Sequence, residues 1–190
     1  KSKTLEALEG YPLEQARAQE FWDEILEEDP TKVEGFLRTY YASCYGKRAG
    51  RASLYDDFLK FFFPELFHGQ MPTSQEQADI LLTRIQSILD EVRLYRKITV
   101  GEWPYTEAQP VTDWDRNRLY VLVKFLSYDI TLPLLLSATK LDHRKYAQLV
   151  HTLEKFMFRY KTVCGNGHQI LSELYNAEAK KIREVPAAYS

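Results

Sequence analysis

The sequence predicts an all-α protein of about eight antiparallel-packed helices around one core. Apolar residues recur at helical spacing along most of its 190 residues, and no stretch shows the alternation typical of a strand. Glycine and proline number only eight each, few enough for a mostly helical chain. The 13 tyrosines and 10 phenylalanines can fill a large core, because aromatic side chains bury large areas.

Charge and hydropathy exclude two broad classes of protein. A net charge of −2 is not that of a strongly basic protein that coats nucleic acid. No apolar run approaches the length of a membrane span, so no membrane partner is expected. Cys44 and Cys164 are far apart and form no CxxC pattern, which favours a cytoplasmic chain with two reduced thiols.

The chain is expected to form a single helical domain over residues 1–190. It begins with Lys rather than Met and opens directly into a helix-like pattern, which predicts a fragment of a longer multidomain protein. The longest expected loop, over residues 99–112, contains Gly101, Pro104 and Pro110 and is the best internal boundary.

Four helices are expected in the first half of the chain, and capping or stop residues bound them. The first covers residues 13–29, and the second runs from a capping box at Thr31–Glu34 to the stop at Gly46. The third covers residues 54–62, before Pro64, and the fourth covers residues 74–97. Proline after Asp29 and after Phe63 favours a helix end, because the residue before proline avoids the helical region.

Four more helices are expected in the second half. They cover residues 113–128 capped by Thr112 or Asp113, 132–138 capped by Thr131, about 143–159 capped by Asp142, and about 170–182. The predicted buried faces include Leu13, Trp22, Phe36, Phe58, Ile85, Trp114, Leu122, Phe125, Phe156, Ile170 and Leu174.

Metal and cofactor sites are not predicted. The four histidines, His68, His143, His151 and His168, form no HExxH motif and none lies beside a cysteine pair. No phosphate-binding loop of the Walker type is present, so no cofactor is expected.

Nucleophilic catalysis has one weak candidate. Cys164 lies in a turn near Arg159 and Lys161, whose charges lower the pKa of a thiol, and His168 follows four residues later. Cys44 lies on an aromatic helix face and is interpreted as a structural thiol. The sequence therefore predicts no catalytic site in this chain.

Nucleic-acid binding is the best-supported property of a site. Lys47, Arg48 and Arg51 cluster in one turn between Tyr45 and Tyr55, where cations can neutralise phosphates and aromatic rings can stack on bases. A second cluster lies at the end of the helix at 74–97, so that the candidate nucleic-acid-binding residues are Lys47, Arg48, Arg51, Arg93 and Lys97.

A structural role fits several of these cations equally well. Basic residues near a helix C-terminus are favoured by the helix dipole, whatever they bind. Two further clusters, one at Lys140–Lys145 and one at Lys180–Arg183, also lie near helix ends.

Several segments together resemble the middle helical region of GmrSD-like proteins. These proteins are modification-dependent (type IV) restriction enzymes and related phage-defence effectors. The segments are Phe36-Leu37-Arg38, Tyr40-Tyr41, Ser43, Tyr45-Gly46, Leu54-Tyr55, Phe58, Thr131-Leu132-Pro133-Leu134-Leu135-Leu136, and Glu154-Lys155-Phe156 with Phe158-Arg159-Tyr160-Lys161-Thr162 and Cys164-Gly165. The similarity covers about residues 20–183.

The resemblance implies a division of labour within a longer protein. Such proteins carry an N-terminal ParB-like domain with an Asp-Gly-Gln-Gln-Arg motif associated with nucleotide hydrolysis, and often a C-terminal HNH-type nuclease domain. Neither signature occurs in this chain, so no catalytic residue is carried over. The implied parent is a nucleotide-dependent DNA endonuclease, and Arg38 and Arg159 match family positions.

Two functions follow as hypotheses. The first is a helical scaffold or linker of a DNA restriction or phage-defence effector, with DNA and the neighbouring nuclease and ParB-like domains as partners. The second is a stand-alone, all-helical protein-interaction module. A continuous basic face favours the first, and an exposed aromatic groove favours the second.

Overall fold

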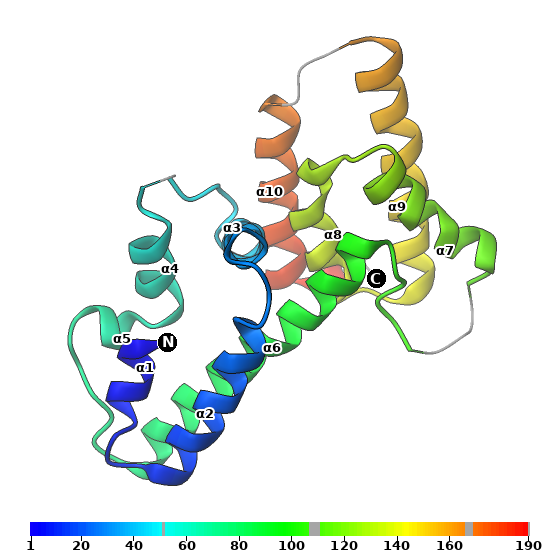
Figure 1. The fold of residues 1–190 in the computed structure, drawn as a ribbon. Helices are drawn as coiled ribbons and strands as arrows, with labels where there is room; N and C mark the ends of the chain where they lie inside the picture. Colours follow the sequence, from blue (N-terminus) through cyan, green and yellow to red (C-terminus); the bar gives the residue numbers. More distant parts are fainter. Residues whose placement is uncertain (51, 107–110, 166–168, 190) are drawn as a thin grey trace. The chain divides into compact units, whose positions relative to one another are not determined.

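The computed structural model describes residues 1–50, 52–106, 111–165 and 169–189. All regular structure within these residues is helical (Figure 1), which confirms the predicted all-α class. The chain divides into two compact units. Unit 1 comprises residues 1–38 and 49–93, and unit 2 comprises residues 39–48 and 94–190.

The division between the units falls inside two helices. Helix α3 (Pro30–Tyr45) and helix α6 (Gln75–Val100) each contribute their first part to unit 1 and their last part to unit 2. The loop at residues 99–112, expected as the best internal boundary, lies within unit 2. A single core shared by all helices stays a prediction.

Among its described residues, unit 1 also contains four helices that belong to it entirely. They are α1 (Ser2–Ala7), α2 (Pro12–Ile25), α4 (Leu54–Phe62) and α5 (Pro64–Phe67). The two helices that sequence periodicity did not predict, α1 and α5, are both shorter than two turns. Pro64, expected only as a stop, also begins α5, because a first-turn residue needs no backbone N–H.

Asp29 rather than Thr31 caps the start of α3. The backbone N–H of Thr31 donates to Asp29 Oδ1 at 2.8 Å, and Glu34 accepts a hydrogen bond from Arg38 one turn later. The predicted capping box at Thr31–Glu34 is therefore wrong, because Pro30 already occupies the first helical position.

A buried hydrogen bond joins α1 to α2 in unit 1. Trp22 Nε1 donates to Thr4 Oγ1 at 2.8 Å, and both residues are buried. Ala18, Trp22 and Ile25 form the buried face of α2. Leu13 is 76% exposed, contrary to prediction, because it lies nine residues, or about half a turn around the helix axis, from Trp22.

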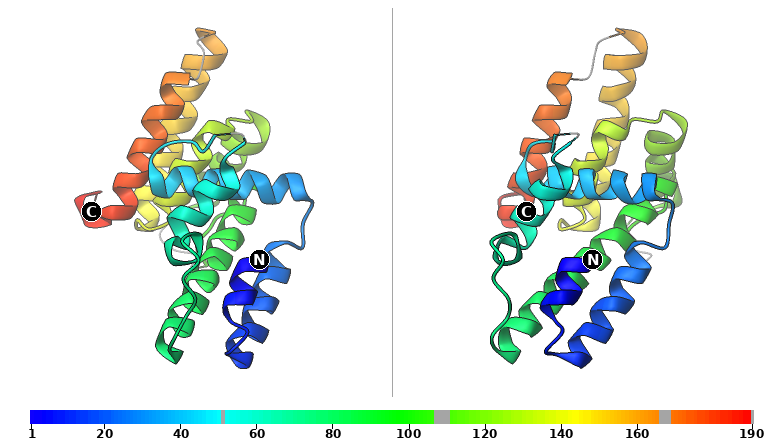
Figure 2. Two further views of the ribbon diagram at one scale, coloured as in Figure 1. Left: turned by 90° about the vertical axis from the view of Figure 1, so that its left-hand side faces the viewer. Right: turned by 60° about the vertical axis from the view of Figure 1, so that its left-hand side comes forward.

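Unit 2 is built around α8 (Leu132–Ala138), whose seven residues are all buried. The helices α7 (Asp113–Tyr120), α9 (His143–Met157) and α10 (Gln169–Glu184) complete the unit (Figures 1 and 2). Two short 3₁₀ turns, Asp129–Thr131 and Pro186–Tyr189, precede α8 and follow α10.

The caps of α7 and α9 agree with the sequence, and that of α8 does not. Thr112 and Asp115 form a complete capping box, and Asp142 Oδ1 accepts a hydrogen bond from the backbone N–H of Lys145. Thr131 makes no cap for α8. Its hydroxyl donates to the carbonyl oxygen of Tyr128 at 2.7 Å, because the preceding 3₁₀ turn already leads the chain into the helix.

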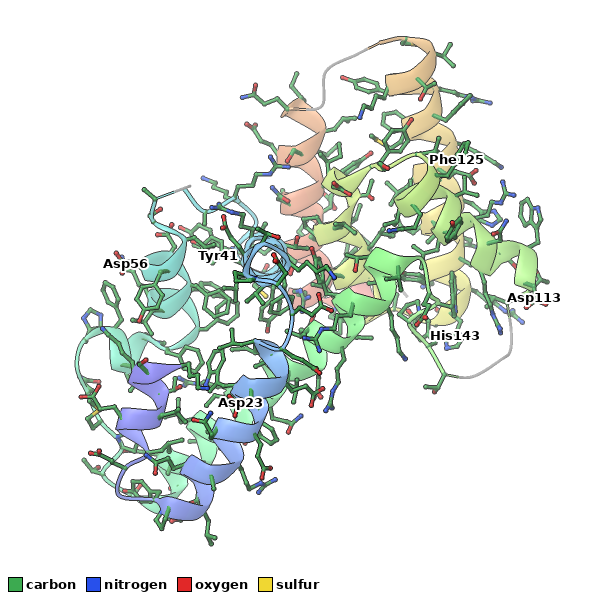
Figure 3. The ribbon with its side chains drawn as sticks, in the orientation of Figure 1. Asp23, Tyr41, Asp56, Asp113, Phe125 and His143 are labelled. Carbon is green, nitrogen blue, oxygen red and sulfur yellow. The ribbon has the colours of Figure 1, made fainter. Side chains whose placement is uncertain are left out.

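An aromatic cluster holds the start of the 101–106 loop against α9. The rings of Trp103 and Tyr105 both lie against Tyr146, with centroids 4.9 and 5.4 Å away. Tyr105 also faces His143, which Figure 3 labels at the start of α9, and its hydroxyl donates to the carbonyl oxygen of Leu141 at 2.8 Å. Burial raises the pKa of Tyr105, consistent with a neutral phenol that donates a hydrogen bond.

Two π-helical turns change which side chains face solvent. They are η1 (Val121–Phe125), after α7, and η3 (Phe158–Val163), after α9. A π turn contains about one more residue than an α-helical turn. Side chains that would lie on the buried face of a regular α-helix, at 3.6 residues per turn, therefore rotate away from the core. Phe125, labelled in Figure 3, is accordingly 79% exposed rather than buried as predicted.

Four more aromatic or aliphatic residues predicted to be buried in unit 2 are exposed: Trp114, Phe156, Ile170 and Leu174. Trp114 packs at the edge of α7, with its ring against His151 and under the guanidinium of Arg118. The remaining three lie on α9 and α10, beside rather than within the buried stripes of those helices.

We predict that Phe58→Ala lowers the free energy of unfolding by about 3–5 kcal/mol, because Phe58 is only 7% exposed and its loss leaves a cavity. The control is Leu13→Ala, which should change the free energy of unfolding by no more than about 0.5 kcal/mol, because Leu13 lies at the surface. Urea denaturation of both variants checks this. Equal losses would contradict the assigned burial of α2 and α4.

Candidate nucleic-acid interface

The turn after α3 places Lys47 and Arg48, two members of the first basic cluster, in unit 2. Helix α3 ends where the backbone N–H of Gly46 donates to the carbonyl oxygen of Ala42. Gly46 has a φ of +85°, which L-residues with side chains rarely adopt. A Cβ atom there would lie 3.1 Å from Lys180 Cδ and 3.7 Å from the carbonyl oxygen of Asn176. Glycine therefore lets the end of α3 approach α10 closely.

Lys47 and Arg48 follow this turn directly and are both exposed. Among the described residues, neither forms an ion pair. Arg51, the third predicted member of the cluster, lies outside the described residues. The two described cations are thus available to an external anion.

Both cations line a cleft of about 920 Å³ within unit 2. Its remaining walls come from the first half of α10 and from the turn before α8. The lining residues are Gly46, Lys47, Arg48, Ile130, Gln169, Ser172, Glu173, Asn176 and Ala177. The cleft combines two cations, three neutral polar side chains and one carboxylate, a composition suited to an anionic ligand with hydrogen-bonding groups.

Two buried polar side chains on α10 form part of this wall. Ser172 and Asn176 lie one turn apart and are 5% and 2% exposed. No described residue makes a hydrogen bond to Asn176 Oδ1. A buried polar atom without a partner costs free energy, and such costs are commonly retained where a site needs the polar group.

Arg93 is held by carboxylates within unit 1. Its guanidinium donates two hydrogen bonds to Glu24, both at 2.7 Å, and lies 3.6 Å from Asp90. The hydrogen bonds to Glu24, with Coulombic attraction to both carboxylates, raise the pKa of Arg93. A bidentate pair of this kind occupies the donors that a phosphate would need.

Lys97 belongs to unit 2, is half-buried on α6, and does not line the cleft. The cluster at the end of α10 is largely engaged with other groups. Lys181 pairs with Glu178 at 2.6 Å, and Arg183 Nε donates to Ser137 Oγ at 3.0 Å. Of the five predicted residues, the structure thus brings Lys47 and Arg48 together at one site.

The catalytic candidates gain no support from their surroundings. Cys164 is exposed in the turn after η3, and its proposed partner His168 lies outside the described residues. Cys44 is half-buried, with its Sγ 3.8 Å from Ser43 Oγ. Within the described ranges, no group of three or more His, Cys, Asp or Glu side chains is placed to hold a metal ion.

The cleft wall on α10 was missed by sequence reasoning, although a signal was present. Ser172 and Asn176 interrupt the buried stripe formed by Leu171, Tyr175 and Ala179. Polar residues beside a buried stripe at a spacing of four identify a helix face that is enclosed but not purely apolar. The pairing of Arg93 with Glu24, 69 residues away in sequence, left no such local signal.

Comparison with protein families and with curated proteins gives no match to this chain. The resemblance to GmrSD-like proteins therefore stays a prediction from the sequence. No helix in the described part of the chain is both long and apolar enough to cross a membrane.

The close approach at Gly46 predicts a specific loss of stability. Gly46→Ala should lower the free energy of unfolding by about 2–3 kcal/mol. The new methyl group would strain the backbone at a positive φ and would also crowd α10. Gly69→Ala is the matched control, since Gly69 has a φ of +75° but nothing within 4 Å of its Cβ position. That control should cost only about 1 kcal/mol.

Chemical denaturation of the two glycine variants measures both losses. A loss at position 46 no greater than that at position 69 would show that contact between the α3 turn and α10 contributes nothing.

Proposed function

We propose that this chain is the helical scaffold of a GmrSD-like DNA restriction or phage-defence effector, and that the turn after α3 contacts DNA. The observation that carries the contact is the pair Lys47 and Arg48. Both are exposed, neither has an ion pair among the described residues, and both line the cleft against α10. The scaffold role rests on the sequence resemblance.

The proposed contact is to the DNA backbone. Lys47 and Arg48 neutralise phosphates and release condensed counterions, which gives salt-dependent binding without sequence preference. Gln169 and Ser172, on the opposite wall of the cleft, supply hydrogen-bonding groups to the same phosphates. The carboxylate of Glu173, which is exposed and also lines the cleft, disfavours a phosphate placed directly beside it.

The chemistry belongs to neighbouring domains in this proposal. A ParB-like domain supplies nucleotide hydrolysis and a nuclease domain cleaves the DNA, in the cytoplasm. The helical chain positions the DNA between these partners and has no catalytic residue of its own.

A protein-interaction module is the second candidate, and the exposed apolar side chains of unit 2 favour it. The largest exposures among its described residues are those of Trp114, Phe125, Val163, Ile170, Leu174 and Val185, each above half. Where such side chains gather into one contiguous patch, the patch is typical of contacts with other proteins.

Binding to a labelled duplex, plain or carrying modified bases, tests the DNA contact. Fluorescence anisotropy over a salt series should show affinity that falls with salt. Lys47→Ala combined with Arg48→Ala should reduce the slope of log affinity against log salt by about two, because two phosphate contacts are lost.

Arg93→Ala is the matched control, because Glu24 already engages that guanidinium. It should leave the slope unchanged. Absence of duplex binding at low salt, or an equal effect of both variants, would remove the DNA contact and favour the protein-interaction module.

A further inference from the structure

The end of α9 and the turn η3 form a second cationic surface in unit 2. We call it the η3 ridge and define it by Lys155, Phe156, Phe158, Arg159, Tyr160 and Lys161. In Figures 1 and 2 this end of α9–η3, drawn in orange, extends beyond the other helices of unit 2. None of its residues lines the cleft described above.

The charge of the ridge is of one sign. Residues 155–165 contain three cations and no carboxylate. Lys155 and Arg159 are exposed, and within the described ranges neither forms an ion pair. The preceding carboxylate, Glu154, is engaged by Arg118 at 3.1 Å and its side chain is 15% exposed.

Aromatic rings flank these cations. Phe156 and Tyr160, one turn apart, are stacked, with their ring centroids 5.5 Å apart and an interplanar angle of 22°. Phe158 lies two residues from each, on the other flank of the helix. Phe156 and Phe158 are 43% and 45% exposed, so their rings remain open to a ligand.

Contacts below the ridge fix its position. Lys161 Nζ lies 5.1 Å from the centre of the Tyr128 ring, and the hydroxyl groups of Tyr128 and Thr162 are 2.5 Å apart. The hydroxyl of Tyr175 donates to Met157 Sδ at 3.3 Å. The rings of the ridge are therefore presented by an anchored turn, which lowers the entropy lost when a ligand binds.

We propose that the η3 ridge binds single-stranded nucleic acid. Unpaired bases stack on the Phe156–Tyr160 pair and on Phe158, and backbone phosphates contact Lys155 and Arg159. Rings interleaved with cations match a chain that alternates bases and phosphates. In a duplex the faces of the bases are covered by their neighbours, so the ridge discriminates against it.

The two surfaces make different demands on a ligand. The turn after α3 offers cations and neutral polar groups, which suit the phosphate backbone of a single strand or of a duplex. The ridge adds open ring faces, which suit unpaired bases. The inference does not depend on the proposed function, because the ridge shares no residue with the cleft.

The test is fluorescence anisotropy with a labelled oligothymidine of about 16 nucleotides, compared with a duplex of equal length over a salt series. The protein should bind the single strand more tightly. Phe156→Leu combined with Phe158→Leu should weaken single-strand binding about 5- to 150-fold with an unchanged salt slope, because leucine keeps apolar volume but cannot stack.

Loss of charge should have a different signature. Lys155→Ala combined with Arg159→Ala should reduce the single-strand salt slope by about 1.4. The matched control is Lys60→Ala combined with Phe61→Leu, an exposed cation beside a 41% exposed ring on α4, whose first turn carries Asp56 and Asp57. It should bind the single strand like the parent, and thermal unfolding checks that all variants are folded.

Three results would overturn the inference. One is single-strand binding that the ridge variants leave intact. Another is equal affinity for both forms, lost together when Lys47 and Arg48 are replaced. The third is failure to bind oligothymidine while phosphatidylserine vesicles bind the parent but not the ridge variants, which would assign the ridge to a membrane surface. Loss of duplex binding alone in the Lys47 and Arg48 variant bears only on the proposed function.

Discussion

The complete burial of α8 is the constraint on which the arrangement of unit 2 depends. A seven-residue helix without an exposed face must be enclosed by other helices, and α10 packs along it. Ser137 on α8 accepts a hydrogen bond from Arg183, whose guanidinium also lies 5.2 Å from the ring centre of Tyr40 on α3. The buried α8 thus fixes the position of α10, and α10 in turn contacts the end of α3. The end of α3 then determines where Lys47 and Arg48 lie.

The availability of a cation, rather than its presence, distinguishes the basic clusters. Arg48 and Arg93 are both exposed arginines near a helix end, and a count of charges treats them alike. Two hydrogen bonds to Glu24 engage Arg93, whereas Arg48 faces a cleft and forms no ion pair among the described residues. A phosphate contacting Arg93 would have to replace a carboxylate that already matches the guanidinium.

Helix type and most helix bounds could be predicted, because they follow from local periodicity and capping chemistry. The buried face of α6 and the caps Thr112 and Asp142 are examples. The outward positions of Phe125 and Leu13 could not be predicted in this way. The position of Phe125 depends on a π turn, and that of Leu13 depends on which face of α2 other residues cover. The candidate site was half predictable: its cations are contiguous in sequence, but its wall on α10 lies more than 120 residues away.

The most direct measurement of the central claim is a nuclear magnetic resonance titration of the ¹⁵N-labelled chain with a short duplex. Contact at the cleft predicts shifts of the Lys47 and Arg48 backbone amides together with the buried side-chain amide of Asn176, while the Arg93 guanidinium stays unchanged. Shifts confined to Arg93 and its surroundings in unit 1, with the cleft signals unmoved, would contradict it.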